Sequence, residues 1–293
     1  MAVLALSNPV VQSYIVYSAI LALKLISVST MTAIARMTRG VFANPEDAKT
    51  LKGKVKFDDP VVERIRRAHL NDLENIPAFW VLGALYLTTG PVAAWATLLF
   101  RVYAVSRIVH TIVYALIPLP QPARGIAFGI PYIIKWYMGF QVAMYYITLS
   151  DPVVQSFIVY SAILALKLIS VSLMTTIARM TRGVFGNPED AKAFKGTVKF
   201  DDPVVERIRR AHLNDLENIP AFWVLGALYL TTGPVVVWAT ILFRVYAVSR
   251  IVHTIVYALI PLPQPARGIA YAIPYIIKWY MGFQVVIYYI SAV

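Results

Sequence analysis

Cysteine is absent from this chain of 293 residues, and charged residues make up only 14% of it. Without a thiol the chain can form no disulfide, no thiolate metal site and no cysteine nucleophile, so any sulfur chemistry must come from a ligand. Each half has only two histidines, His69 and His110 in the first, and neither joins a His/Asp/Glu triad at metal-ligand spacing. Gly-x-Ser-x-Gly, GxGxxG and Walker motifs are also missing, which argues against a serine hydrolase and a nucleotide-binding site.

Long apolar runs are abundant instead. The chain is 59% hydrophobic and 13% aromatic, with a mean hydropathy of +0.65. Crossing ~30 Å of hydrocarbon takes about 20 apolar residues, and the first half supplies four such runs: Val10–Ala35, Ile65–Thr89, Val92–Ile117 and Gly125–Ile147. We expect an all-α integral membrane protein. The start of the chain lacks the basic region and cleavage site of a removable signal peptide, so we expect the first run to act as the targeting segment.

The second half of the sequence repeats the first. Residues 8–148 align without a gap with residues 151–291 at a constant offset of 143, with 16 differences in 141 positions. A repeat of this length is a whole domain rather than a solenoid unit. The sequence therefore predicts two tandem four-helix transmembrane bundles with eight spans, one in 8–148 and one in 151–291.

Charge is concentrated between the first two runs of each copy. In the first copy, Arg36 to Glu74 contains nine Lys/Arg and seven Asp/Glu, and the PLPQPAR turn adds Arg124. The positive-inside rule places these two loops in the cytosol, and the net charge of +12 then faces a membrane surface rather than nucleic acid. Pro60, with Asp58 or Asp59 as N-cap, predicts that the second helix begins near residue 60.

Two of the predicted helices carry polar stripes. One comprises Arg67, Asn71 and Glu74, spaced i, i+4 and i+7. The other comprises Arg107, His110 and Tyr114. Arg36 ends the first helix and Arg124 begins the fourth. Polar groups from four helices thus lie at one depth, where charged groups in a membrane protein normally face a partner or an aqueous cavity.

Simpler interpretations compete for several of these residues. Arginines and lysines near span ends often only extend to the lipid headgroups, and this is the favoured interpretation of each of the following alone: Arg36, Arg39, Arg64, Arg101 and Lys135. His110 is equally a buried hydrogen-bonded histidine or a ligand contact. Lys24, alone in an apolar run, is expected to pack or pair within the bundle.

Three stretches and their counterparts in the second copy resemble a known family: VFANPEDA, DDPVVERIRRAHLNDLENI and RIVHTIVYALIPLPQPARG. With the four-span layout, they are similar to the membrane-associated proteins in eicosanoid and glutathione metabolism (MAPEG), most closely the microsomal glutathione transferases among them. The resemblance covers essentially all of each copy. It implies glutathione bound between neighbouring modules near the cytosolic face of a homotrimer, although two modules per chain do not divide evenly into three.

The family motifs also imply which residues contact glutathione. In the first copy they are Arg36, Arg67, Asn71, Glu74, Arg107, His110, Tyr114 and Arg124. In the second copy they are Arg179, Arg210, Asn214, Glu217, Arg250, His253, Tyr257 and Arg267. This set suits glutathione, which offers two carboxylates to arginines, an amine to a glutamate, and the thiol that the chain itself lacks.

The leading hypothesis is transfer of glutathione to lipophilic electrophiles, with a further capacity to reduce lipid hydroperoxides. Arg124 and Arg267 are the candidate catalytic residues, because a guanidinium at the start of the fourth helix can stabilise the thiolate. We also expect the chain to contact membrane lipid and to form a homo-oligomer. The expected location is the endoplasmic reticulum, with the outer mitochondrial membrane as a further one. Two alternatives stay open: a glutathione-dependent eicosanoid isomerase or synthase, and a non-enzymatic lipid-binding scaffold.

Several positions depart from the family patterns. Prostaglandin-synthesising members have Arg, Ser and Tyr where this chain has Leu70, Gly125 and Phe128, which weakens the isomerase interpretation. Ala48 stands where mammalian transferases carry a cysteine, so control through that thiol is not expected. Tyr271 replaces Phe128 in the second copy, so the two sites are expected to differ slightly at their mouths.

Overall fold

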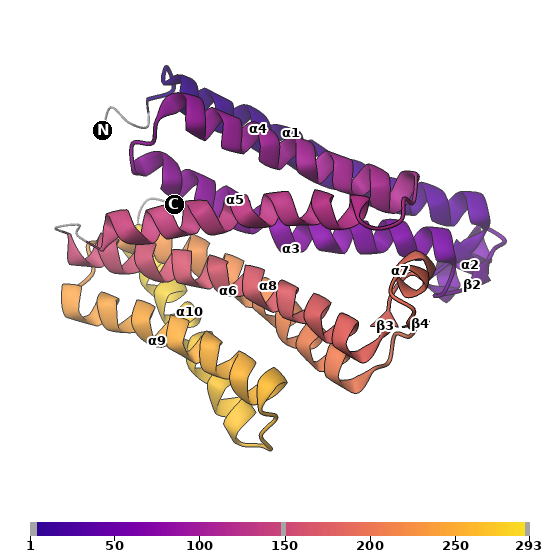
Figure 1. Cartoon of the computed structure of the whole chain (residues 1–293). Helices are drawn as coiled ribbons and strands as arrows, with labels where there is room; N and C mark the ends of the chain where they lie inside the picture. Colours follow the sequence, from indigo (N-terminus) through magenta and orange to yellow (C-terminus); the bar gives the residue numbers. More distant parts are fainter. Residues whose placement is uncertain (1–4, 148–150, 291–293) are drawn as a thin grey trace. The chain divides into compact units, whose positions relative to one another are not determined.

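The computed structural model describes residues 5–147 and 151–290, and the chain is 81% helical (Figure 1). The first copy contains α1 (Pro9–Arg39), β1 (Val41–Phe42), α2 (Pro45–Thr50), β2 (Lys54–Val55), α3 (Pro60–Thr88), α4 (Ala93–Thr111), the π-helix η2 (Ile112–Leu116) and α5 (Ala123–Tyr146). The second copy contains α6 (Pro152–Arg182), β3 (Val184–Phe185), α7 (Pro188–Ala193), β4 (Thr197–Val198), α8 (Pro203–Leu230), α9 (Val236–Thr254), the π-helix η3 (Ile255–Leu259) and α10 (Ala266–Tyr289).

The fold class predicted from the sequence is confirmed, with all eight expected spans helical. Four segments, Pro9–Arg39, Ala93–Leu116, Pro152–Arg182 and Val236–Leu259, are long and apolar enough to cross a membrane by length and composition. Among the other long helices, α3 and α8 carry more charged residues, whereas α5 and α10 are rich in aromatic residues. With 29 residues, and at ~1.5 Å per residue, α3 measures about 44 Å.

Local chemistry explains where the helices begin and end. The Asn8 side chain caps α1 by accepting a hydrogen bond from the Val10 amide, and α1 ends at Gly40, whose φ of +60° is favourable only for glycine. At the start of α3, Asp59 Oδ1 accepts hydrogen bonds from the amides of Val61 and Val62. The predicted helix start near Pro60 is therefore confirmed, with Asp59 as its cap.

The short strands are one feature that was not predicted from the sequence. The two-residue strands β1 and β2 pair in parallel, with Val41 opposite Lys54 and Phe42 opposite Val55, and β3 pairs with β4 in the second copy. These pairs bracket α2 and α7. Two residues per strand are too few for a period-2 pattern to be visible in the sequence.

The chain forms two compact units that do not coincide with the two sequence copies. Unit 1 comprises the described parts of Met1–Ile76, Gly90–Ile134 and Phe185–Val198. Unit 2 comprises Pro77–Thr89 and the described parts of Lys135–Val184 and Lys199–Val293. The loop segment that contains α7 thus belongs to the second copy in sequence but to unit 1 in space.

Each unit has its own helix packing. In unit 1, α1 lies along α4 (Figure 1), and a buried apolar cluster that includes Val28, Val41 and Val62 joins α1, β1 and α3. In unit 2, α6 and α10 each pack against both α8 and α9, which makes a four-helix bundle. Aromatic rings fill its core, where Phe222 stacks on Tyr246 with ring centroids 4.0 Å apart.

Candidate functional site

A buried ionic cluster lies at the centre of the polar residues of unit 1. Asp72 of α3 forms ion pairs with Arg107 of α4, at 2.5 Å between Nη2 and Oδ1, and with Lys24 of α1. The hydroxyl of Thr111 lies 3.4 Å from the other carboxylate oxygen. The side chains of Asp72 and Arg107 have no exposed surface. The cluster therefore joins three helices through one carboxylate.

This cluster changes the role expected of Arg107. Its guanidinium also donates a hydrogen bond of 2.8 Å to Asn71 Oδ1, which confirms that the two predicted stripes face each other. Most of its hydrogen-bonding capacity is nevertheless used within the protein, mainly by Asp72, although its Nη1 is buried without a hydrogen-bond partner among the described residues. Pairing was one of the two roles expected of Lys24, and the ion pair confirms it.

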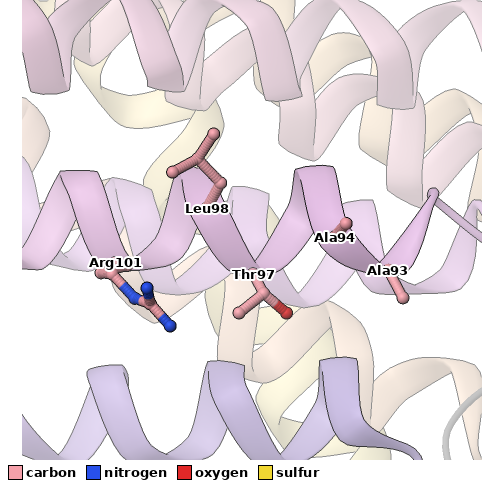
Figure 2. Close-up of a pocket in the computed structure, with 5 residues that line it drawn as sticks. All are labelled: Ala93, Ala94, Thr97, Leu98 and Arg101. Atoms are coloured by element: carbon pink, nitrogen blue, oxygen red, sulfur yellow. The ribbon is translucent and has the colours of Figure 1, made fainter.

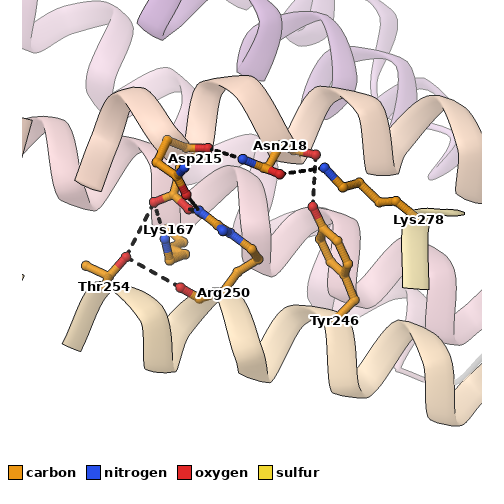
Figure 3. A network of polar contacts seen from close by, with 8 residues as sticks. Lys167, Asp215, Asn218, Tyr246, Arg250, Thr254 and Lys278 are labelled. Carbon is orange, nitrogen blue, oxygen red and sulfur yellow. Dashed lines mark hydrogen bonds and ion pairs between the residues drawn. The ribbon is translucent and has the colours of Figure 1, made fainter. Parts of the chain in front are cut away.

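Asp72 was not among the residues predicted from the sequence. The available signal was Lys24, since a lone cation in an apolar run requires a carboxylate of the same bundle. The second copy reproduces the cluster in unit 2 (Figure 3): Arg250 Nε donates to Asp215 at 3.0 Å, and Lys167 pairs with the same carboxylate. Arg250 also donates to Asn214 at 2.8 Å.

A second group of polar residues in unit 1 surrounds the start of α5. Arg67 Nη1 donates to Asn187 Oδ1 at 2.9 Å, and Asn187 Nδ2 donates to the Tyr114 hydroxyl at 2.8 Å. The Arg124 guanidinium lies over the Tyr114 ring, 4.2 Å from its centroid, and its Nη1 lies 3.1 Å from Asp190 Oδ1. We refer to Arg67, Tyr114 and Arg124 as the cationic cluster, and to Asn187–Asp190 as the acidic segment.

Arg124 is the most enclosed cation of this cluster. Its side chain is only 4% exposed, and its Nε is buried without a hydrogen-bond partner among the described residues. The acidic segment approaches from the other side: Arg64 forms an ion pair of 2.8 Å with Glu189, and Gln121 contacts Asp190 at 3.4 Å. A buried guanidinium with an unused donor is a feature that an anionic ligand would satisfy.

The π-helix η2 helps to set the geometry of this cluster. In it the amide of Ile117 donates to the carbonyl of Ile112 at 2.8 Å, a wider turn than an α-helix provides. His110 stacks on Tyr114 with centroids 5.4 Å apart, and Phe128 lies 6.4 Å from His110. Because π-turns have no sequence pattern, this feature was outside the reach of sequence analysis.

The counterpart cluster in unit 2 is more open. Arg267 lies 5.7 Å from the Tyr257 centroid, against 4.2 Å for the equivalent pair in the first copy. His253 stacks on Tyr257 at 5.5 Å, as in the first copy. Arg210 and Glu217 are exposed, whereas their equivalents Arg67 and Glu74 are partly buried. The two copies share a site composition but differ in its enclosure.

The remaining candidate residues lie at the edges of these clusters. Arg36 and Arg179 are partly buried near the ends of α1 and α6, and the Nη1 of Arg36 is buried without a hydrogen-bond partner among the described residues. Hydrogen bonds and ion pairs join Arg67, Tyr114 and Arg124 through the acidic segment, and a hydrogen bond joins Asn71 to Arg107. Arg36 lies outside both groups.

Two of the residues interpreted as extending to lipid headgroups have partners or burial that correct that interpretation. Arg64 forms an ion pair with Glu189 and is only 20% exposed, whereas Arg39 pairs with Asp59 but stays 43% exposed. Lys135 has no exposed surface, so it does not extend to the headgroups. Arg101 remains exposed and donates a hydrogen bond of 3.0 Å to the Tyr17 hydroxyl.

An open groove lies further along α4, away from the cationic cluster. It has a volume of about 460 Å³ and is lined by Ala93, Ala94, Thr97, Leu98 and Arg101 (Figure 2). Arg101 precedes Arg107 by six residues, which is about 9 Å along a helix. The groove is therefore not part of the candidate site. No group of three or more His, Cys, Asp or Glu side chains suited to a metal ion occurs within residues 5–147 and 151–290.

Comparison with known proteins gives the family. The MAPEG family model matches twice, over residues 14–144 and 157–287. The chain belongs to the MAPEG family. Microsomal glutathione S-transferase 1 from Sus scrofa is 46% identical over 142 residues, and that of Homo sapiens is 43% identical over 143 residues. Each alignment covers 47% of this chain and 91% of the relative. Prostaglandin E synthase from Bos taurus is 37% identical over 139 residues, covering 47% of this chain and 90% of the relative.

These MAPEG relatives match the length of one copy, so this chain corresponds to two modules of the family in tandem. All candidate site residues of both copies fall within the matched ranges. The boundaries proposed for the two modules, 8–148 and 151–291, extend slightly beyond these ranges.

Proposed function

We propose that the chain is a glutathione transferase that conjugates glutathione to lipophilic electrophiles in a membrane. The observation that carries this proposal is Arg124: it is 4% exposed, lies against Tyr114 and keeps a buried Nε without a hydrogen-bond partner among the described residues. Glutathione is proposed as the co-substrate because relatives at 43–46% identity are named glutathione S-transferase. Arg267 has the same unpartnered Nε in the second copy.

The proposed role of Arg124 and Arg267 is to stabilise the ionised sulfur of glutathione. A free thiol has a pKa of about 8.5, and a nearby guanidinium lowers that value because it favours the thiolate. Each pKa unit corresponds to about 1.4 kcal/mol, so one charge-assisted hydrogen bond accounts for a shift of one to two units. Nη1 of Arg124 lies 3.1 Å from Asp190 Oδ1, and both Nη1 and Nε are buried without a hydrogen-bond partner among the described residues, so we propose that one of these two N–H groups donates to the sulfur.

The reaction then needs no further group from the chain. The thiol proton passes to solvent, and the thiolate attacks an electrophilic carbon. A carbon–sulfur bond forms while the leaving group departs with its bonding electrons. The same thiolate would attack the terminal oxygen of a lipid hydroperoxide, which breaks the O–O bond and releases the lipid alcohol once its oxygen is protonated. The sulfenic acid of glutathione formed in this step would react with the thiol of a second glutathione, giving glutathione disulfide and water. Both substrates are apolar and would approach from the lipid.

The remaining candidate residues would hold the rest of glutathione. Glu74 and Glu217 are proposed to bind its amine, while Arg36 and Arg67, with their second-copy equivalents, bind its carboxylates.

We further propose that these sites face the cytosol at the endoplasmic reticulum, because the basic loops lie beside them. Lysine labelling of KTLKGKVKFDD and KAFKGTVKFDD in sealed vesicles reports that orientation.

Calorimetric titration of glutathione tests the proposal. Replacing Glu74 and Glu217 together by Gln should weaken binding by about 1–3 kcal/mol, because each change removes the charge that pairs with the amine. Conjugation of a chromogenic aryl halide by the unmodified protein should be measured in parallel. Unchanged affinity in the double variant would remove these glutamates from the site, and an unmodified protein that binds but does not conjugate would favour the isomerase or scaffold alternative.

A further inference from the structure

The groove along the first part of α4 is a feature that the proposed glutathione chemistry does not use. Its volume of about 460 Å³ falls within the ~300–1,000 Å³ that is typical of sites for small molecules. Ala93 and Ala94 contribute only a methyl group each, which leaves space along the surface of the helix. The side chains of Thr97 and Arg101 lie on the same side of α4 (Figure 2). The groove therefore combines small apolar walls with two polar side chains.

Arg101 is the charged group of this groove. Its Nε donates a hydrogen bond of 3.0 Å to the Tyr17 hydroxyl of α1, which holds the guanidinium between the two helices. Within residues 5–147 and 151–290 this is the hydrogen bond that Arg101 makes, and it forms no ion pair there, so both terminal nitrogens keep their N–H groups as donors. None of the five residues that line the groove is acidic. Because a cation on a membrane span normally has an anionic partner, that partner is expected from outside the chain.

The position of Arg101 along α4 fits the level of lipid headgroups. Arg101 follows Ala93, the first residue of α4, by eight residues, which is about 12 Å at ~1.5 Å per residue. Side chains of a helix tilt toward its N-terminus, and the long arginine side chain carries the guanidinium further in that direction. Trp95, which is exposed in the first turn of α4, is a residue type that favours the membrane–water interface. The guanidinium thus lies close to the interface at the end of α4 that is away from the basic loops.

Exposed apolar residues continue from Arg101 toward the middle of the bilayer. Val105 and Ile108 follow it by four and seven residues, so they lie on the same face of α4, and both are exposed. Along this face the order is therefore a polar groove at the interface and then an apolar surface. A phospholipid has its phosphate and its acyl chains in the same order.

The two copies differ at this groove more than elsewhere. Three of its five lining positions differ, against 16 of 141 positions in the whole repeat: Ala93 is replaced by Val236, Ala94 by Val237 and Leu98 by Ile241. Thr240 and Arg244 are unchanged, and Arg244 Nε donates to the Tyr160 hydroxyl at 3.0 Å. The second copy thus keeps the cation and its tyrosine, but it has branched side chains where the first copy has methyl groups.

We propose that the groove of the first copy binds one anionic phospholipid, whose phosphate accepts hydrogen bonds from the terminal nitrogens of Arg101. Arginine and phosphate form such bonds in pairs, which fixes the position of the headgroup. The hydroxyls of Thr97 and Tyr17, with no carboxylate in the lining, suit a headgroup that carries hydroxyls rather than an amine. In the second copy Val236 and Val237 fill the space that this headgroup needs. The site is separate from the glutathione chemistry and does not depend on it.

Native mass spectrometry of the intact chain in detergent counts the lipids that stay bound. Titration with phosphatidylglycerol should give one tightly bound lipid per chain, and phosphatidylcholine should bind about tenfold more weakly, because its amine finds no carboxylate. Arg101→Gln should weaken phosphatidylglycerol binding about tenfold, since the charge-assisted hydrogen bonds are lost. Arg244→Gln is the matched control: it changes the same residue type with the same tyrosine contact and should leave the bound lipid in place.

Exchanging the walls between the copies tests the space independently of the charge. Ala93→Val with Ala94→Val keeps Arg101 but gives the first copy the walls of the second, and it should remove the tightly bound lipid. Val236→Ala with Val237→Ala should create a second tightly bound lipid beside Arg244. All four positions are exposed, so the unfolding midpoint should stay unchanged in both variants.

Three results would overturn the proposal. Equal losses from Arg101→Gln and Arg244→Gln would show that the lipid responds to surface charge in general. A lipid that stays bound when the alanines become valines would show that the groove is not its site. Equal binding of the two lipids would contradict the selection of an anionic headgroup.

Discussion

Asp72 accepts contacts from Lys24, Arg107 and Thr111, although it has no exposed surface. Moving charges out of water is costly, and the attraction between them offsets this cost only when every partner is present. Removing one member leaves the others buried and unpaired. The cluster is thus a structural element beneath the candidate site, and it holds Asn71 and Arg107 in register.

Replacing Asp72 by Asn should therefore destabilise the protein strongly, by about 3–5 kcal/mol, because two buried cations lose their counter-charge. The unfolding midpoint in detergent, followed by tryptophan fluorescence, measures the effect. Asp58→Asn is the matched control: Asp58 is exposed, and its contact to Lys56 is 3.8 Å, so the change should be within about 0.5 kcal/mol. Equal effects of the two variants would show that the buried pairing adds no stability.

At the scale of the helices, the carboxylates that cap α3 and α8 also pair with the end of the preceding long helix. Asp59 pairs with Arg39, and Asp202 with Arg182. At Asp202 the hydrogen bond from Arg182 is the largest cause of a lowered pKa. Burial alone would raise the pKa of Asp59, but the bond from Arg39 and the amides of Val61 and Val62 outweigh it and lower the pKa.

A lowered pKa in the folded state gives a definite pH dependence. The contribution to stability is fully present above the unfolded-state pKa of about 3.9 and is lost as pH falls through the folded-state value. Stability should thus decline below about pH 4. Asp59→Asn with Asp202→Asn keeps the caps, because Asn also caps well, but should flatten this decline when unfolding midpoints are compared between pH 3 and 6. A decline as steep as that of the unmodified protein would assign it to other carboxylates.

At the scale of the whole molecule, the sequence predicted those features of the fold that depend on residues close together along the chain. The eight spans follow from apolar runs, the start of α3 from Asp-Pro, and the pairing of Lys24 from its isolation in an apolar run. Four features lay beyond it: the short strand pairs, the choice of Asp72 as the shared carboxylate, the π-turn around Tyr114, and the acidic segment.

The acidic segment was out of reach for a particular reason. Both copies contain the same NPED residues, so no residue pattern tells which copy binds which cluster. Only the packing of unit 1 decides it, together with the clearance at Gly186, where a Cβ would lie 3.3 Å from Arg67 Nη1 and which a comparison of the copies would have passed over as a mild Ala-to-Gly change.

Direct titration of the bound thiol tests the central claim that buried arginines make glutathione reactive. The ultraviolet absorbance of the thiolate is followed against pH in the difference spectrum between bound and free glutathione. We predict a bound-thiol pKa about one to two units below the free value of about 8.5. Arg124→Leu with Arg267→Leu should restore the free value while changing affinity only a few fold. A bound thiol in the unmodified protein that titrates like free glutathione would contradict the account.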